Sequence, residues 1–371
     1  MKHKTSYGRL PAWLVAIVCG ACLSGGCGDS SVGGSTDAAV GTVATVELSD
    51  SALRDLIDEV LDFTEHRREL SSERHAAWQI LHGVLAFGRD FEIMHEGQPV
   101  NTLDWVLGGG KMRGWTMRRG SIGLKAVLEL GSKAGQGHED QWLAVISQCD
   151  LPADQPITLG EEKFTIDDLV RQAQHDLYDD KECSWTLIGL SQYLPMTAEW
   201  DAGGSAWSLE RIVAMEAGLD MEPEDAQYHV NRAACGGSHR LIGMTMALDR
   251  YRRAYPAAEL TGGWFAAQQQ IVWAVEMAKQ NQLPSGAFSV NYFERSTNSV
   301  DLAEHLGATG HTLEFLSLAL TDEQLREPWV RRAAVHLCEL FKKTESIELE
   351  CGALYHAAHG LVLYRRRLFG P

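Results

Sequence analysis

Segments that would form helices with no polar face recur six times after residue 47. In residues 74–87 (RHAAWQILHGVLAF), for example, apolar side chains fall on almost every side of a helix. Such a helix must be surrounded by other elements, because any exposed side would leave apolar surface in water. The same region shows no strand-rich alternation and no clear β-hairpin signal, so the sequence predicts an all-α fold.

Each apolar segment follows an amphipathic one, which predicts a series of helical hairpins. Six inner apolar helices within a ring of six outer helices would all be buried, so we expect a closed α/α toroid. An open α-solenoid of the same hairpins is the alternative. The predicted outer and inner helices are residues 50–68 and 74–87, 121–130 and 139–148, 165–177 and 184–194, 208–217 and 238–250, 264–279 and 310–320, and 328–343 and 352–364.

The first 27 residues have the pattern of an exported protein. A basic stretch without acidic residues precedes an apolar run over residues 11–23, which is too short to span a bilayer. Small residues then lead to Cys27, and this string resembles the lipobox of bacterial lipoproteins, whose cysteine is acylated after cleavage. We expect export to the cell envelope and attachment to the membrane through a lipid on Cys27. A plain secretory signal, cleaved near Ala21 or Gly26, is the alternative.

The chain therefore divides into a signal peptide (residues 1–26), a tether (27–47) and one α/α-toroid domain (48–371). Residues 28–46 contain only small, polar and short apolar side chains, as a flexible tether would. In the whole chain 33 Lys and Arg face 50 Asp and Glu, a formal charge of −17. This charge argues against nucleic acid or an anionic lipid surface as the main partner. Eight Cys are too few for a disulfide scaffold.

Two short segments resemble the terpenoid cyclase and protein prenyltransferase superfamily, whose α/α toroids carry prenyltransferase–squalene oxidase repeats. Residues 280–288 (QNQLPSGAF) resemble the Q…G-x-W/F turn between those repeats. Residues 352–361 (GALYHAAHGL) resemble a prenyltransferase β-subunit segment whose histidine is a zinc ligand, which would be His356. The Asp-x-Cys and Asp-x-Asp-Asp signatures of these enzymes are missing, as are the Cys-His-Gly element of lanthionine cyclases and the thioester motif of complement-like toroids. The resemblance therefore implies a fold and no particular activity.

In a toroid the inner helices run parallel, so their N-terminal ends would meet at one mouth. Six of the 13 His after the signal peptide fall near these ends. The residues expected there are His75, Trp78, His138, Asp140, Gln141, Cys183, Trp185, Cys235, His239, His305, His311, Cys351 and His356.

These residues allow several functions, and no substrate can be named. We expect binding of a ligand or partner at the mouth, with an enzyme as the alternative, either zinc-assisted or an acid–base glycan hydrolase or lyase. The same residues can also be explained without a function. Helix starts favour polar side chains because backbone amides there lack partners, and cysteine is often a small buried core residue. The candidate ligand-binding residues are Trp78, Trp185, Cys235, His239, His311 and His356; the candidate zinc ligands are Cys235, His239, His311, Cys351 and His356; the candidate catalytic residues are Asp140, His138, His239 and His356.

Two His-Gly pairs, His82-Gly83 and His359-Gly360, lie inside predicted inner helices. We interpret them as an echo of the repeat, with close helix packing at each glycine, and not as catalytic groups.

Overall fold

The computed structural model describes residues 48–370. The predicted signal peptide, tether and acylation site at Cys27 lie outside the described residues. The described part is mostly helical, with fourteen α-helices and four separate two-stranded antiparallel sheets. None of its helices has the length and apolar character needed to cross a bilayer.

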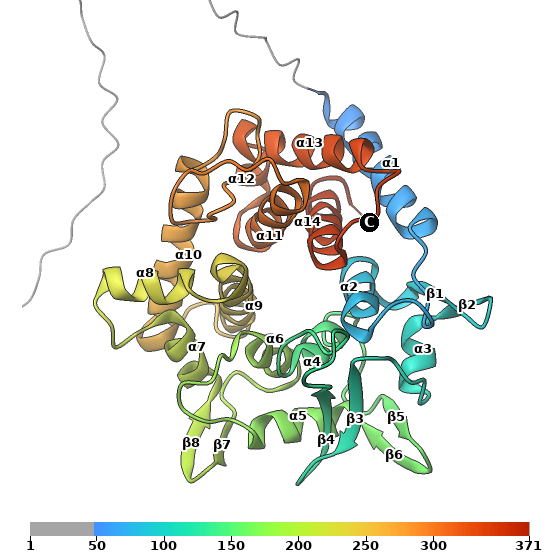
Figure 1. Ribbon diagram of the computed structural model, residues 1–371. Coiled ribbons are helices and arrows are strands. Elements are labelled where there is room, and N and C mark those ends of the chain that lie inside the picture. Colours follow the sequence, from blue (N-terminus) through green and yellow to red (C-terminus); the bar gives the residue numbers. More distant parts are fainter. Residues whose placement is uncertain (1–47, 371) are drawn as a thin grey trace, which may run out of the picture. The chain divides into compact units, whose positions relative to one another are not determined.

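All six apolar segments form helices. In chain order each contacts the next, and the last contacts the first, so that residues near both ends of the described chain pack together (Figure 1). In the central helix of the C-terminal half every residue from Leu306 to Ser317 is buried, as expected for a helix without a polar face. The six helices are α2 (Ala77–Phe87), α4 (Gln141–Ile146), α6 (Ser184–Tyr193), α9 (Ser238–Ala254), α11 (Leu302–Ala319) and α14 (Cys351–Phe369).

Five of the six predicted amphipathic helices are also present, and they pack outside the apolar ones (Figure 1). Their starts follow local rules of helix capping. Ser49 accepts a hydrogen bond from the amide of Ala52, and Asp168 accepts one from the amide of Thr165. These helices are α1 (Asp50–Arg67), α5 (Ile166–His175), α7 (Leu209–Ala217), α10 (Gly262–Gln280) and α13 (Pro328–Lys343).

The prediction of an outer helix over residues 121–130 is wrong, because this segment belongs to a β-hairpin. Three further hairpins were also missed. Two of the four turns are Glu96-Gly97 and Gly203-Gly204, with φ between +51° and +81°, the conformation that closes a two-residue hairpin. The strand pairs are β1 (Glu92–His95) with β2 (Gln98–Asn101), β3 (Trp115–Arg119) with β4 (Leu124–Leu128), β5 (Pro156–Leu159) with β6 (Glu162–Thr165), and β7 (Glu199–Ala202) with β8 (Ser205–Ser208).

Short helices complete the described part, and one long helix starts earlier than expected. α11 begins at Leu302 instead of near residue 310, so His305 and His311 lie within it. The short helices are α3 (Thr102–Leu107), α8 (Pro223–Asn231), α12 (Asp322–Leu325) and the 3₁₀ turns η1 (Gly88–Asp90) and η2 (Ala234–Gly237).

Helices α11 and α14 pack closely because glycines face each other. A Cβ atom on Gly310 would lie 2.6 Å from the Cα of Ala357, and one on Gly360 would lie 3.0 Å from the carbonyl oxygen of Gly310. Gly83 of the other His-Gly pair lies directly against the ring of Phe91. The predicted close helix packing is thus confirmed at Gly360, whereas at Gly83 the close neighbour is a side chain outside the helices. The close packing at Gly360 brings the polar side chains of α11 and α14 within reach of each other.

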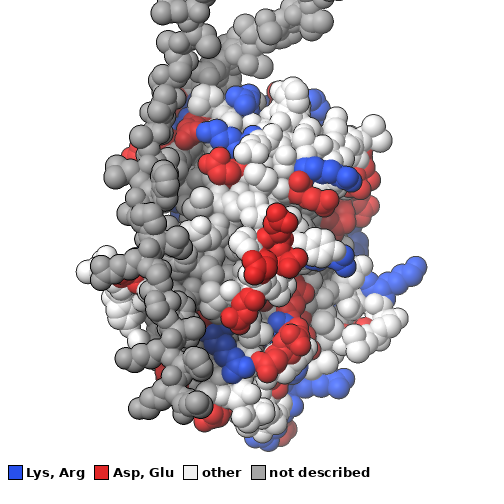
Figure 2. Space-filling model, turned by 90° about the vertical axis from the view of Figure 1, so that its left-hand side faces the viewer, with Lys and Arg blue, Asp and Glu red and all other residues white. Residues whose placement is uncertain are grey.

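Charge on the molecular surface is unevenly distributed. Figure 2 shows acidic side chains gathered in a band on the face formed by α7, α8 and α10, with basic side chains towards its margins. Exposed acidic residues of α8 and the turn before it, Glu222, Glu224 and Asp225, belong to this part of the chain. This face thus carries some of the acidic residues that give the chain its negative charge.

Candidate functional site

Three helices each contribute one histidine to a buried cluster. His239 lies in the first turn of α9, His311 in the third turn of α11 and His356 in the second turn of α14. The ring centroids of His239 and His311 are 5.0 Å apart, those of His239 and His356 are 5.1 Å apart, and the stacked rings of His311 and His356 are 3.9 Å apart. All three side chains are at most 4% exposed.

A tight turn adds a thiol to this cluster. Cys235 has a φ of +53° in η2, and Gly236 and Gly237 continue in the left-handed region, which needs glycine. The ligand atoms of Cys235, His239 and His311 all lie within 4.8 Å of one another. A non-glycine residue with positive φ is strained, and such strain is often found at functional sites.

The imidazoles are oriented by hydrogen bonds on one nitrogen only. The Nδ1 atom of His311 lies 2.7 Å from the carbonyl oxygen of Gly307, and the Nδ1 atom of His356 lies 2.7 Å from Oε2 of Glu314. If each Nδ1 carries the proton for these acceptors, Nε2 presents a lone pair. Neither Nε2 has a partner, and both ring nitrogens of His239 are also unpartnered and buried. An Nδ1 anchored by an acceptor and a free Nε2 are typical of metal-binding histidines.

Glu314 is the buried carboxylate behind the cluster. Its Oε1 atom lies 2.7 Å from the Nδ1 of His359, so one carboxylate links two histidines of α14. Burial raises the pKa of Glu314, but the two histidines overcome this effect and hold that pKa well below its usual range. Glu314 is therefore a carboxylate at neutral pH, although it is only 2% exposed.

Burial disfavours the charged form of two imidazoles in and beside the cluster. Burial and the neighbouring His311 lower the pKa of His356 to about 3, and burial lowers the pKa of His82 to about 4. Burial also lowers the pKa of His311, but the adjacent Cys235 raises it to about 9; conversely, His311 lowers the pKa of Cys235 against the effect of burial. Metals bind neutral imidazole and thiolate, so binding at His311 would displace the proton that its raised pKa retains at neutral pH.

A cavity of about 490 Å³ opens onto these side chains. The predicted ligand-binding residues Trp78, Cys235, His239, His311 and His356 all line it, and so does the predicted catalytic residue His138. The remaining lining residues are His82, Gln141, Val290, Asn291, Tyr292, Ala303, Glu304, Gly307, Ala308, Glu350, Gly352 and Ala353. A larger groove of about 890 Å³ along α9, α10, α11, α12 and α14 has neither His nor Cys in its wall.

Two of the predicted site residues lie behind the cavity instead of in its wall. Trp185 is buried, and its ring centroid is 4.5 Å from that of His239, so it supports this imidazole. Cys351 is buried and accepts a hydrogen bond from Nε2 of Gln79 at 3.6 Å. It does not belong to the group formed by Cys235, His239 and His311.

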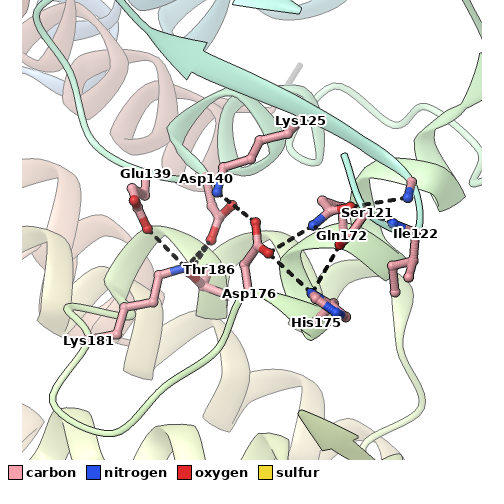
Figure 3. A network of polar contacts seen from close by, with 11 residues as sticks. Ser121, Ile122, Lys125, Glu139, Asp140, Gln172, His175, Asp176, Lys181 and Thr186 are labelled. Carbon is pink, nitrogen blue, oxygen red and sulfur yellow. Dashed lines mark hydrogen bonds and ion pairs between the residues drawn. The ribbon is translucent and has the colours of Figure 1, made fainter. Parts of the chain in front are cut away.

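Asp140 is also placed outside the cavity. It precedes α4 with a φ of +59°, and its Oδ2 atom accepts hydrogen bonds from Nζ of Lys181 at 2.8 Å and from the hydroxyl of Thr186. Figure 3 also draws a second group of polar contacts, in which Lys125 pairs with Asp176 at 2.6 Å. Asp140 thus connects the start of α4 to α6 and the residues before it. It does not lie beside His138 as an acid or base.

Three residues of the site were not selected from the sequence. Glu314 could have been recognised as the single charge in an apolar helical segment, and His82 had been interpreted as a packing residue. Tyr292 lines the cavity with a backbone φ of +51°, which no local sequence pattern indicates.

Comparisons with known proteins identify no relative of this chain. No protein-family model matches it, and neither a curated protein nor a solved structure does. Function is therefore inferred from the geometry of the described residues.

Proposed function

We propose that residues 48–371 form an α/α toroid with α2, α4, α6, α9, α11 and α14 as its inner helices. The contacts of α14 with α2, together with the burial of each inner helix, support this arrangement. An open solenoid would keep its first and last repeats apart. In the toroid, the cluster of His239, His311 and His356 lies at the centre, where helices from different repeats meet.

We propose that the cluster binds a zinc-type divalent metal through Cys235, His239 and His311. The observation that carries this proposal is the proximity of their ligand atoms, all within 4.8 Å. Thiolate and imidazole are the ligands that zinc and its neighbours in the first transition series prefer. The Glu314 carboxylate and the Gly307 carbonyl orient the imidazoles of His356 and His311, as outer-shell acceptors do in metal sites.

A purely structural role explains the cluster less well. An unpaired buried polar group costs about 1–3 kcal/mol, and His239, His311 and His356 together hold four such nitrogens in one place. Glu314 moreover has no lysine or arginine partner within residues 48–370. A buried negative charge needs a compensating positive one. A divalent cation would supply positive charge and would occupy one ring nitrogen each of His239 and His311.

Three protein ligands beside a cavity favour a site that acts on a small molecule. Structural zinc sites have four protein ligands, whereas catalytic sites have three and leave a position for water or substrate. When bound, such a metal supplies Lewis acidity for polarising a carbonyl group or activating water. His356 keeps a free Nε2 at the cavity wall, where it could hold or move a proton of the bound molecule. This arrangement favours an enzyme over the ligand-binding protein without turnover that the sequence suggested.

The proposed location of this activity is the cell envelope. Export and acylation at Cys27 are supported by the basic start, the apolar run and the small residues before Cys27. In this proposal the partners are the membrane, reached through the lipid, and a small molecule in the cavity. Nucleic acid is not among them, because the chain carries a large excess of negative charge.

Metal analysis of two cysteine variants tests the proposal. After incubation with zinc and gel filtration, the wild type is expected to hold about one equivalent, and Cys235→Ser is expected to lose most of it. Cys351→Ser is the matched control, since Cys351 is a free cysteine at the start of α14 but lies outside the ligand group. Inductively coupled plasma mass spectrometry measures the metal content. Equal retention of zinc by both variants would contradict the proposed site.

A further inference from the structure

The cavity beside the proposed metal site carries acidic side chains and no aliphatic basic ones. Glu304 and Glu350 line it, and none of the described lining residues is Lys or Arg. The Glu314 carboxylate lies directly behind His356. Glu304 is exposed on the first turn of α11 and has no ion-pair partner within residues 48–370. Away from the metal itself, a negatively charged group of a ligand would therefore meet carboxylates where phosphate-binding sites offer Lys or Arg.

At two of the helix starts beside this cavity, those of α14 and α2, amide groups are already bonded to oxygens of the protein. The N-terminus of a helix attracts anions through its free amide groups. At the start of α14, however, Glu350 accepts hydrogen bonds from the amides of Gly352 and Ala353 at 2.8 and 2.7 Å. At the start of α2, the carbonyl oxygen of Arg113 accepts a hydrogen bond from the amide of Ala77 at 2.8 Å. The protein's own oxygens thus satisfy these donors.

Aromatic side chains form the other part of the wall. Trp78 is half-buried beside the start of α14, and its ring centroid is 4.6 Å from that of His82. Tyr292, in the segment between α10 and α11, lies next to His311. The centroids of these two rings are 6.4 Å apart. The faces of indole and phenol rings attract organic cations. A cavity of about 490 Å³ has room for a compact organic molecule.

We propose that the ligand of this cavity is a small organic amine, bound as its ammonium ion near Glu304 and Glu350 and against the ring of Trp78. This inference rests on the proposed function, because it names the class of molecule that would be presented to the metal. The unpartnered nitrogens of His239, His311 and His356 point independently to a ligand at this place. Diphosphates and organic carboxylates are the classes that the cavity disfavours.

Binding of matched probes to the full-length, zinc-loaded protein tests the ligand class. Phenethylamine and 3-phenylpropionate have the same ring and a chain of similar length but opposite charge, and inorganic pyrophosphate represents the diphosphates. By isothermal titration calorimetry we expect the amine to bind at least about tenfold more tightly than either anion. Glu304→Gln is expected to weaken amine binding by about three- to tenfold. The control Glu323→Gln, an exposed residue outside this cavity, should leave it unchanged.

The outcomes separate this inference from the metal proposal, since zinc content is measured on the same samples. Zinc-loaded protein that binds pyrophosphate or phenylpropionate as tightly as the amine overturns the amine assignment alone. No binding of the amine at millimolar concentration, or an unchanged affinity in Glu304→Gln, also overturns it. If the protein retains no zinc but still prefers the amine, the metal proposal is wrong and the proposed ligand class is retained.

Discussion

His239→Leu is expected to lower the affinity for zinc by more than about 100-fold, because losing a ligand should exceed the 10- to 100-fold effect of losing an outer-shell partner. The same substitution is expected to raise the stability of the metal-free protein by about 1–3 kcal/mol, because neither ring nitrogen of His239 has a hydrogen-bond partner. Residues that serve a functional site often lower the stability of the fold, which is a trade-off between stability and activity. Competition with a chromogenic chelator measures the affinity, and thermal unfolding with EDTA measures the stability.

His336→Leu is the matched control for this experiment. His336 has an unpartnered buried Nε2 as well, but it lies on α13 and does not line the cavity. The substitution His336→Leu should also raise the stability of the metal-free protein, but it should leave the affinity for zinc unchanged. If His239→Leu destabilised the metal-free protein and bound zinc normally, His239 would be a packing residue only.

Glu314→Ala is expected to destabilise the folded protein by about 2–6 kcal/mol, because two buried N–H groups lose their acceptor at about 1–3 kcal/mol each. The substitution leaves the Nδ1 groups of His356 and His359 without their acceptor and creates a gap between α11 and α14. Glu314→Gln keeps the shape and one acceptor oxygen, so its effect should be smaller. Chemical denaturation in urea measures the loss.

Glu304→Ala provides the comparison on the same helix, since Glu304 is exposed and should change stability by no more than about 0.5 kcal/mol. The effect of Glu314 should also depend on pH. Because the folded state holds the pKa of Glu314 below its ordinary value of 4.5, its contribution is complete above that pH. The contribution is lost as the pH falls through the lower folded-state pKa. Equal stability of the alanine variants at positions 304 and 314 near neutral pH would show that Glu314 does not organise the cluster.

The helices could be predicted because a fully buried helix has a recognisable sequence pattern, with apolar residues on every side. Residues 352–364 have no polar face, and such a helix can exist only when it is surrounded. The β-hairpins have no comparably clear sequence pattern. The run Leu124–Leu128 suits either a helix or a strand, and the turn before it contains Ser121 and Gly123 without an Asn-Gly pair. Tertiary context therefore decided the conformation of this segment.

The histidines of the site could be predicted, but the geometry that unites them could not. His311 was expected in the first turn of an inner helix, whereas α11 starts nine residues before it. It joins the cluster because Gly310 and Gly360 let α11 and α14 approach closely. Spacing also cannot show which way a side chain points at a helix start. Asp140 points towards Lys181, a residue 41 positions later in the chain, and thus away from the cavity.

The most direct test of the central claim is zinc K-edge X-ray absorption of the zinc-loaded, full-length protein. Coordination by Cys235, His239 and His311 predicts one sulfur scatterer at about 2.3 Å and two imidazole nitrogens at about 2.0–2.1 Å. The sulfur shell should disappear in Cys235→Ser and remain in Cys351→Ser. A first shell made only of oxygen and nitrogen in the wild type, or a sulfur shell that survives in Cys235→Ser, would contradict the account.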